Sequence, residues 1–127
     1  MERAVKTREE AERVIMVGVS VEDGDDALDS LKELEELLRT AGAEVVGTVL
    51  QNREMIHPGT YVGKGKVEEI RRMISAAGAD GIVCDDELTS VQYKNLEDLL
   101  GVKVMDRTMV ILDIFARHAK SSEGKIQ

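Results

Sequence analysis

Val14-Ile15-Met16-Val17-Gly18-Val19 is a continuous apolar run with the length of a β-strand. Such a run without polar alternation is typical of a strand that is buried on both faces, as in a parallel sheet. Three further apolar runs follow it, at Val45–Leu50, Gly81–Cys84 and Val102–Met105. Each of the four runs precedes a segment with helical periodicity, so the sequence predicts four β–α units in succession.

The segments between the strands carry the signals of helix ends. A glycine follows three of the predicted helices, as glycine does at helix C-termini: Gly42, Gly78 and Gly101. We expect the second helix to begin at Val67 and the fourth to run from Met109 to about Lys120, with Thr89 and Thr108 as N-caps of the last two. The fold class that follows is a three-layer α/β domain. Its four-stranded, mainly parallel sheet has an order like 2-1-3-4 and is flanked by helices.

The composition limits the classes of function that the chain can serve. Its 127 residues carry a formal net charge of −8, so any contact with nucleic acid must use a local basic patch. Aromatic residues make up only 2%, too few for a platform that stacks the bases of single strands. The single cysteine excludes an intramolecular disulfide and a cysteine zinc site, and Cys84 is expected to be an inert core thiol.

The sequence contains no apolar run near the ~20 residues that span a membrane, and residues 1–6 lack the apolar segment of a signal peptide. We therefore expect a cytoplasmic protein without membrane contact.

The longest predicted connection, Gln51–Gly65, leads into the second helix at the carboxyl edge of the sheet, where ligands of such folds bind. Gly63 and Gly65 can adopt positive φ, and they alternate with Lys64 and Lys66. Free N–H groups, two lysines and a helix N-terminus together predict a phosphate-binding corner. Arg53 and Arg107 are weaker candidates for the same role, and a flexible turn with two solvated lysines is the alternative.

Other candidate sites carry weaker signals. The run Gly59–Gly65 is one residue short of a Walker A loop and lacks its Ser or Thr, so we reject that motif. Asp85 and Asp86 are weak candidates for Mg²⁺ ligands, and an acidic helix entry explains them better. His57 has no nearby nucleophile and is expected at the surface.

The fourth predicted helix is apolar nearly all round, which one small sheet does not explain. We expect Ile111 and Phe115 to face a partner domain or subunit.

Three groups of residues, in this order and spacing, resemble the N-terminal domain of the HflX family of ribosome-associated GTPases. They are Thr60-Tyr61-Val62-Gly63-Lys64-Gly65-Lys66-Val67-Glu68-Glu69-Ile70, then Asp85-Asp86-Glu87-Leu88 with Asn95-Leu96-Glu97, and then Val102–Thr108 with Ile111–Ala116 and Glu123-Gly124-Lys125. The resemblance implies an N-terminal α/β domain over residues 1–120 and a connector over 121–127 toward a helical hairpin and a G domain.

The resemblance also implies a function and partners. These are binding to the large ribosomal subunit and its rRNA, contact with the protein's own helical and G domains, and, for the whole protein, GTP, Mg²⁺ and the splitting or rescue of ribosomes. The motifs G-x-x-x-x-G-K-[ST] and N-K-x-D do not occur in this chain, which we therefore expect not to be an enzyme and to hold no cofactor itself. Two alternatives stay open: an ATP- or nucleotide-binding domain that uses the glycine-lysine loop, and a docking domain that regulates the G domain.

Overall fold

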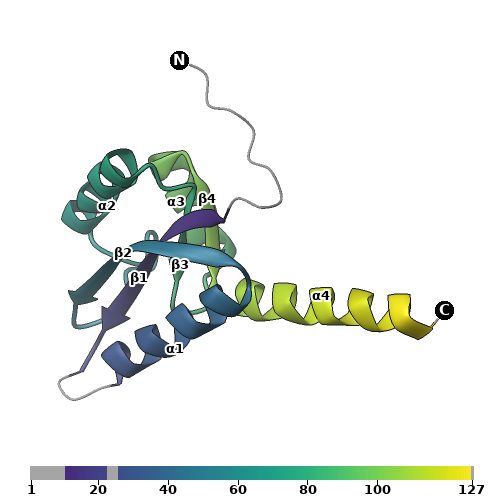
Figure 1. Cartoon of the computed structure of the whole chain (residues 1–127). Helices are drawn as coiled ribbons and strands as arrows, with labels where there is room; N and C mark the ends of the chain where they lie inside the picture. The colour runs from purple at the N-terminus through teal and green to yellow at the C-terminus, as the bar shows by residue number, and fades with distance from the viewer. Residues whose placement is uncertain (1–10, 23–25, 127) are drawn as a thin grey trace.

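The computed structural model describes residues 11–22 and 26–126 and contains four strands that alternate with four helices (Figure 1). In chain order the elements are β1 (Glu12–Ser20), α1 (Ala27–Thr40), β2 (Ala43–Asn52), α2 (Lys64–Ala77), β3 (Gly81–Cys84), α3 (Ser90–Leu100), β4 (Lys103–Asp106) and α4 (Arg107–Ile126).

The four strands form one parallel sheet in the order β2-β1-β3-β4, which confirms the predicted topology. β1 lies in the interior of the sheet, and its Val14 and Ile15 are both 0% exposed. Val14 pairs with Val45 while Ile15 pairs with Gly47, so Val46 is an extra residue in β2 and the ladder shifts there.

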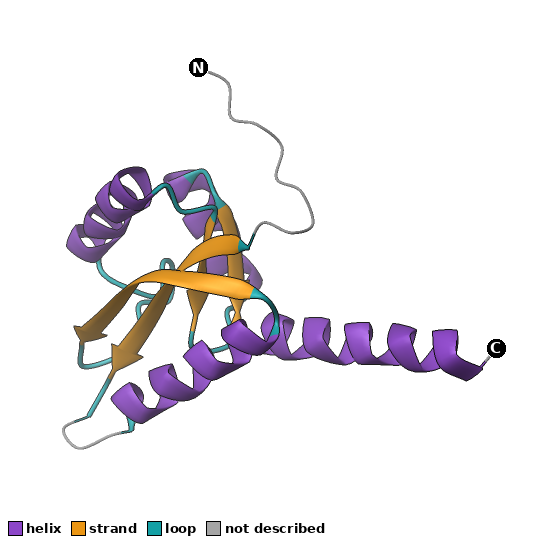
Figure 2. Cartoon of the chain, in the orientation of Figure 1, coloured by secondary structure: helices purple, strands orange, loops and turns teal. Residues whose placement is uncertain are grey.

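Helices cover both faces of the sheet, so the domain has the three layers that the sequence predicted (Figure 2). One face packs against α2 and α3, whose buried residues include Val67, Ile70 and Leu96. The other face packs against Leu31, Leu34 and Leu38 of α1 and Val110 of α4. The helices that follow β2 and β3 thus share one face, and the helices that follow β1 and β4 share the other.

The helix ends confirm part of the predicted local structure. Gly78 and Gly101 end α2 and α3 with left-handed φ values of 64° and 69°. Thr89 caps α3 in a complete capping box with Gln92. The predicted cap of the last helix is wrong, because Asp106 and not Thr108 accepts the N–H of Met109, at 3.0 Å.

α4 packs on the sheet only through its first turns and then runs past the body of the domain (Figure 1). Val110 is buried, whereas Leu112 and Phe115 are 60% and 67% exposed. Ile111, the other predicted interface residue, is partly buried. The predicted end near Lys120 is wrong, since the helix continues to Ile126 and residues 121–126 are helical.

Within residues 11–22 and 26–126, no helix combines the length and the apolar character that crossing a bilayer requires.

Leu34→Ala tests how α1 packs on the sheet. Leu34 is 0% exposed, so the substitution leaves a cavity and should lower the free energy of unfolding by about 2–5 kcal/mol. Leu28→Ala in the same helix is the control, because Leu28 is 64% exposed and its loss should change stability by less than about 0.5 kcal/mol. Urea unfolding followed by circular dichroism measures both variants, and equal losses would contradict the inward face of α1.

Candidate functional site

The connection between β2 and α2 is an ordered loop built around the His57 side chain. His57 Nδ1 accepts hydrogen bonds from the backbone N–H groups of Gly59 and Thr60, at 3.0 and 3.1 Å. The backbone of His57 pairs with that of Tyr61 in both directions. The ring nitrogen of His57 thus lies against the backbone of the loop. His57 is partly buried, and its side chain orders the loop, a role that the sequence analysis did not predict.

Side chains of α3 hold this loop against the domain. Gln92, itself buried, donates from Nε2 to the carbonyl of His57 at 2.9 Å. Asn95 donates from Nδ2 to the carbonyl of Gly59, also at 2.9 Å. These contacts fix the loop, which differs from the flexible turn that the sequence left as the alternative.

Tyr61 is the residue with left-handed backbone in this loop, with φ at 68°. Gly63 and Gly65 do not use the positive φ that glycine allows, since Gly63 has φ −72° and Gly65 lies within α2. Left-handed backbone at a bulky residue such as Tyr61 costs about 1–3 kcal/mol, so other contacts must stabilise it. The Tyr61 side chain is 1% exposed, and its hydroxyl donates to Asp86 Oδ2 at 2.6 Å. Burial and the Asp86 carboxylate raise the pKa of the phenol.

α2 begins at Lys64, three residues before the predicted start, so both lysines lie in its first turn. Gly63 is the N-cap: its N–H donates to Gln51 Oε1 at 2.8 Å and its carbonyl accepts from Val67 N–H at 3.0 Å. No side chain caps this helix. The backbone N–H groups of the first turn therefore lack helical partners, and a side chain at Gly65 would meet nothing within 4 Å.

Three cationic side chains lie at this helix start. Lys64 is exposed, and within the described part of the chain no acidic group pairs with it. Lys66 pairs with Glu69 at 3.1 Å. A Cβ added at Gly63 would lie 2.5 Å from Arg53 Nη1, so the Arg53 guanidinium lies directly against the N-cap. We call Arg53, Gly63, Lys64, Gly65 and Lys66 the cationic corner.

Arg107, a weaker candidate for the same role, lies elsewhere. Its Nη2 is 2.7 Å from Asp85 Oδ1 and 2.6 Å from the carbonyl of Ser30, and Glu33 lies 3.5 Å from its Nη1. The side chain is 23% exposed. Arg107 thus joins β3, α1 and α4, and its donors point at protein acceptors.

Asp85 and Asp86 both have protein partners, Arg107 and Tyr61. Among the described residues, no group of three His, Cys, Asp or Glu side chains could hold a metal ion. A phosphate at the ends of β1 and β3, where nucleotides bind in such sheets, would meet these carboxylates. The geometry therefore gives the nucleotide-binding alternative little support.

Asp106 stabilises the fold through hydrogen bonds that the sequence analysis missed. It is 2% exposed and accepts the N–H of Leu88 at 2.9 Å as well as that of Met109. A signal was present, since Asp is a preferred N-cap and stands directly before α4. Cys84 is fully buried as expected, and burial with the carboxylates of Asp106, Asp86 and Asp85 raises the pKa of its thiol.

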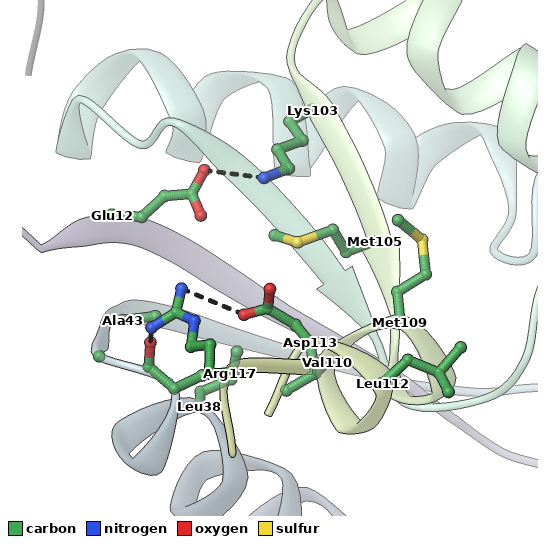
Figure 3. Close-up of a pocket in the computed structure, with 12 residues that line it drawn as sticks. Glu12, Leu38, Ala43, Lys103, Met105, Met109, Val110, Leu112, Asp113 and Arg117 are labelled. Carbon is green, nitrogen blue, oxygen red and sulfur yellow. Dashed lines mark hydrogen bonds and ion pairs between the residues drawn. The ribbon is translucent and has the colours of Figure 1, made fainter. Parts of the chain in front are cut away.

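A groove of about 610 Å³ lies at the opposite edge, where the strands begin (Figure 3). Met105 and Met109 line it together with Leu112 of α4. Two ion pairs stand at its rim, Glu12–Lys103 at 3.4 Å and Asp113–Arg117 at 3.1 Å. The sequence analysis did not predict this groove, because it depends on how α4 leaves the sheet.

Known proteins of one family resemble this chain. A family model described as GTP-binding GTPase N-terminal matches residues 28–116. The chain is 61% identical, over all its 127 residues, to the GTPase HflX of Lacrimispora saccharolytica, and covers 30% of that protein. It is 41% identical over 103 residues to the GTPase HflX of Escherichia coli, a match that spans 81% of the chain and 24% of the relative. The chain thus spans about 30% or less of the length of these relatives.

Solved structures show the same fold. A GTP-binding protein from Sulfolobus solfataricus in complex with GDP matches with a TM-score of 0.61 at 18% identity, over 82% of this chain and 30% of that one. The G235P variant of SsGBP matches with a TM-score of 0.66 at 20% identity, over 90% of this chain and 35% of that one. At these identities the likeness concerns the fold alone.

The two tyrosines give a spectroscopic test of the site. Partial burial and the nearby Asp106 carboxylate raise the pKa of Tyr93, as burial and Asp86 do for Tyr61. Since the unfolded phenols ionise near pH 10, the folded chain should show no tyrosinate absorbance at 295 nm at about pH 10.5. Stability should fall as pH rises above about 10, because these phenols then lose their protons in the unfolded state but keep them in the folded state. The urea-unfolded chain is the control; a folded chain that titrates near pH 10 would contradict the burial of Tyr61.

Proposed function

This chain belongs to the family of N-terminal domains of HflX-type GTP-binding GTPases, and we propose that it is the part of such a protein that binds the RNA of the large ribosomal subunit. The observation that carries the proposal is the cationic corner. Unpaired backbone N–H groups at the start of α2, the exposed Lys64 and the guanidinium of Arg53 converge there. Such a helix start favours the oxygens of a phosphate group.

The remainder of the surface explains why this contact would be local. The chain has a formal net charge of −8, so we expect attraction to RNA to act locally, at the corner, and not over the whole surface. Contacts to phosphates orient a protein on RNA without reading the bases. Binding should therefore depend on the shape of the rRNA and weaken steeply with added salt.

Within the whole protein, this domain would position a GTPase on the subunit. We propose that GTP and Mg²⁺ bind in a separate domain, that this chain does not hydrolyse GTP, and that the whole protein splits or rescues ribosomes. With a ribosomal partner, the protein would act in the cytoplasm.

A second role, docking to other domains of the same protein, is favoured by α4. Leu112 and Phe115 are large apolar side chains that are 60% and 67% exposed. They follow each other at a spacing of three residues, and so lie on one side of the helix. Such a stripe is suited to packing against another helix or domain, which would regulate or orient the G domain.

The double variant Lys64→Ala/Lys66→Ala tests the RNA contact. Losing two phosphate contacts should weaken binding to purified large subunits about tenfold at low salt and reduce the salt slope by about 2. Co-sedimentation across a salt series measures both quantities. The double variant Lys32→Ala/Lys94→Ala removes the same charge from exposed positions on α1 and α3 and should bind like the unaltered chain. Equal binding by both double variants would remove the corner from the proposal.

Phe115→Glu tests the docking role. The charge on the exposed stripe of α4 should reduce binding to the separately produced remainder of the full-length protein at least tenfold, since burying it there is costly. Leu28→Glu places the same charge on an equally exposed site of α1 and should have no effect. Isothermal titration calorimetry compares the two, with rRNA binding measured in parallel. Undiminished binding by Phe115→Glu would place the docking surface elsewhere.

A further inference from the structure

Two neighbouring carboxylates after β3 contact two different parts of the domain. Asp86 Oδ2 accepts the hydroxyl of Tyr61 at 2.6 Å. Asp85 Oδ1 accepts from Arg107 Nη2 at 2.7 Å and from Nε at 3.2 Å. The pair therefore stands between the loop that leads to the cationic corner and the first residue of α4.

On the loop side, Tyr61 lies close before the start of α2. Tyr61 is buried, has left-handed backbone and stands two residues before the N-cap Gly63. Its neighbour Val62 is buried as well, and Gly63 is fixed by Gln51. Because only Val62 separates Tyr61 from Gly63, we expect a shift of Tyr61 away from Asp86 to move Gly63 and the cationic corner.

On the other side, Arg107 determines how α4 begins. It donates to the carbonyl and to the hydroxyl of Ser30, at 2.6 and 2.9 Å, and so fastens the first turn of α4 to α1. The Asp85 side chain is only 8% exposed. Without Arg107 it would be a nearly buried anion with no counter-charge, next to the Asp86 carboxylate.

We propose that Asp85 and Asp86 couple the position of the cationic corner to the packing of α4 on α1, with Tyr61 and Arg107 as positioning residues. The physical cause is that both contacts hold the same two consecutive residues after β3. When one contact is lost the other still fixes these residues, so losing both partners costs more than the two separate losses. If RNA binds at the corner, as the proposed function has it, the coupling would transmit this binding to α4. The coupling itself is measured without RNA.

A double-mutant cycle of Tyr61→Phe and Arg107→Gln on the whole chain measures the coupling. For independent sites, the change in the unfolding equilibrium constant of the double variant equals the product of the single changes within about twofold. Here we expect the double variant to exceed that product at least threefold. If Arg107→Gln does not fold, Arg107→Lys takes its place, because it lacks the planar fork that reaches Asp85 and Ser30 together.

The matched control is the same cycle with Arg117→Gln. Arg117 also fastens α4 to α1, through a 2.8 Å bond from Nη1 to the carbonyl of Ala41, and it has no contact with Asp85 among the described residues. That cycle should stay within the twofold limit. An equal excess in both cycles, or no excess with Arg107, overturns the proposal.

The amide resonances of the corner give a second measurement on the same proteins. Arg107→Gln should shift the backbone N–H signals of Gly63, Lys64 and Gly65 in a proton–nitrogen correlation spectrum, and Arg117→Gln should leave them in place. Unmoved corner signals in Arg107→Gln also overturn the proposal. Neither measurement contains RNA, so failed coupling and failed RNA binding are separate results.

Discussion

The burial of β1 on both faces is the constraint on which the rest of the structure depends. Val14, Ile15, Met16 and Val17 are at most 2% exposed. Each such side chain contributes about 1.5–3 kcal/mol only if it is covered, so helices are needed on both faces of the sheet. The N-terminal end of β1 is fixed by a reciprocal pair, in which Arg13 N–H donates to Asp80 Oδ2 at 2.8 Å and Asp80 N–H donates to the Arg13 carbonyl at 2.7 Å.

Predictions from sequence succeeded where the signal is local and repeated. The strand order and the inward faces of the helices follow from apolar runs, periodicity and the glycines at helix ends, all of which are properties of short segments. The start of α2 was predicted too late because Gly65 is a poor helix former, and the contacts that begin the helix at Lys64 come from Gln51, a distant residue. Asp106 was overlooked as a cap because it also ends an apolar strand.

The candidate site was predicted only in part for the same reason. The sequence placed Lys64, Lys66 and their glycines correctly at a helix start on the carboxyl edge. It gave no indication of the backbone of Tyr61, because a left-handed tyrosine is stabilised by tertiary contacts alone. The partners of Arg107 lie 22 and 77 residues away, and spacing in the sequence does not reveal such contacts. The contacts of Arg107 with Asp85 and Ser30 therefore had to be found in the structure.

The carboxyl edge divides into two zones with different electrostatic character. Three carboxylates lie around the buried Cys84, and hydroxyl, guanidinium or backbone N–H donors satisfy them. The cations of the cationic corner, of which Lys64 is exposed, lie at the start of α2. A ligand that carries phosphate would therefore bind at the start of α2. The carboxylates around Cys84 stabilise the fold instead.

The two arginines of α4 have a geometric consequence. Arg107 and Arg117 reach α1 at Ser30 and Ala41, in the same order along both helices. Ten residues of helix separate the two attachments by about 15 Å. A helix that is attached at two separated points keeps a fixed direction, whereas a helix attached at one point can pivot about it. The direction of α4 beyond Arg117 is therefore set by the domain. A group attached to the end of this helix would be oriented by the same two contacts.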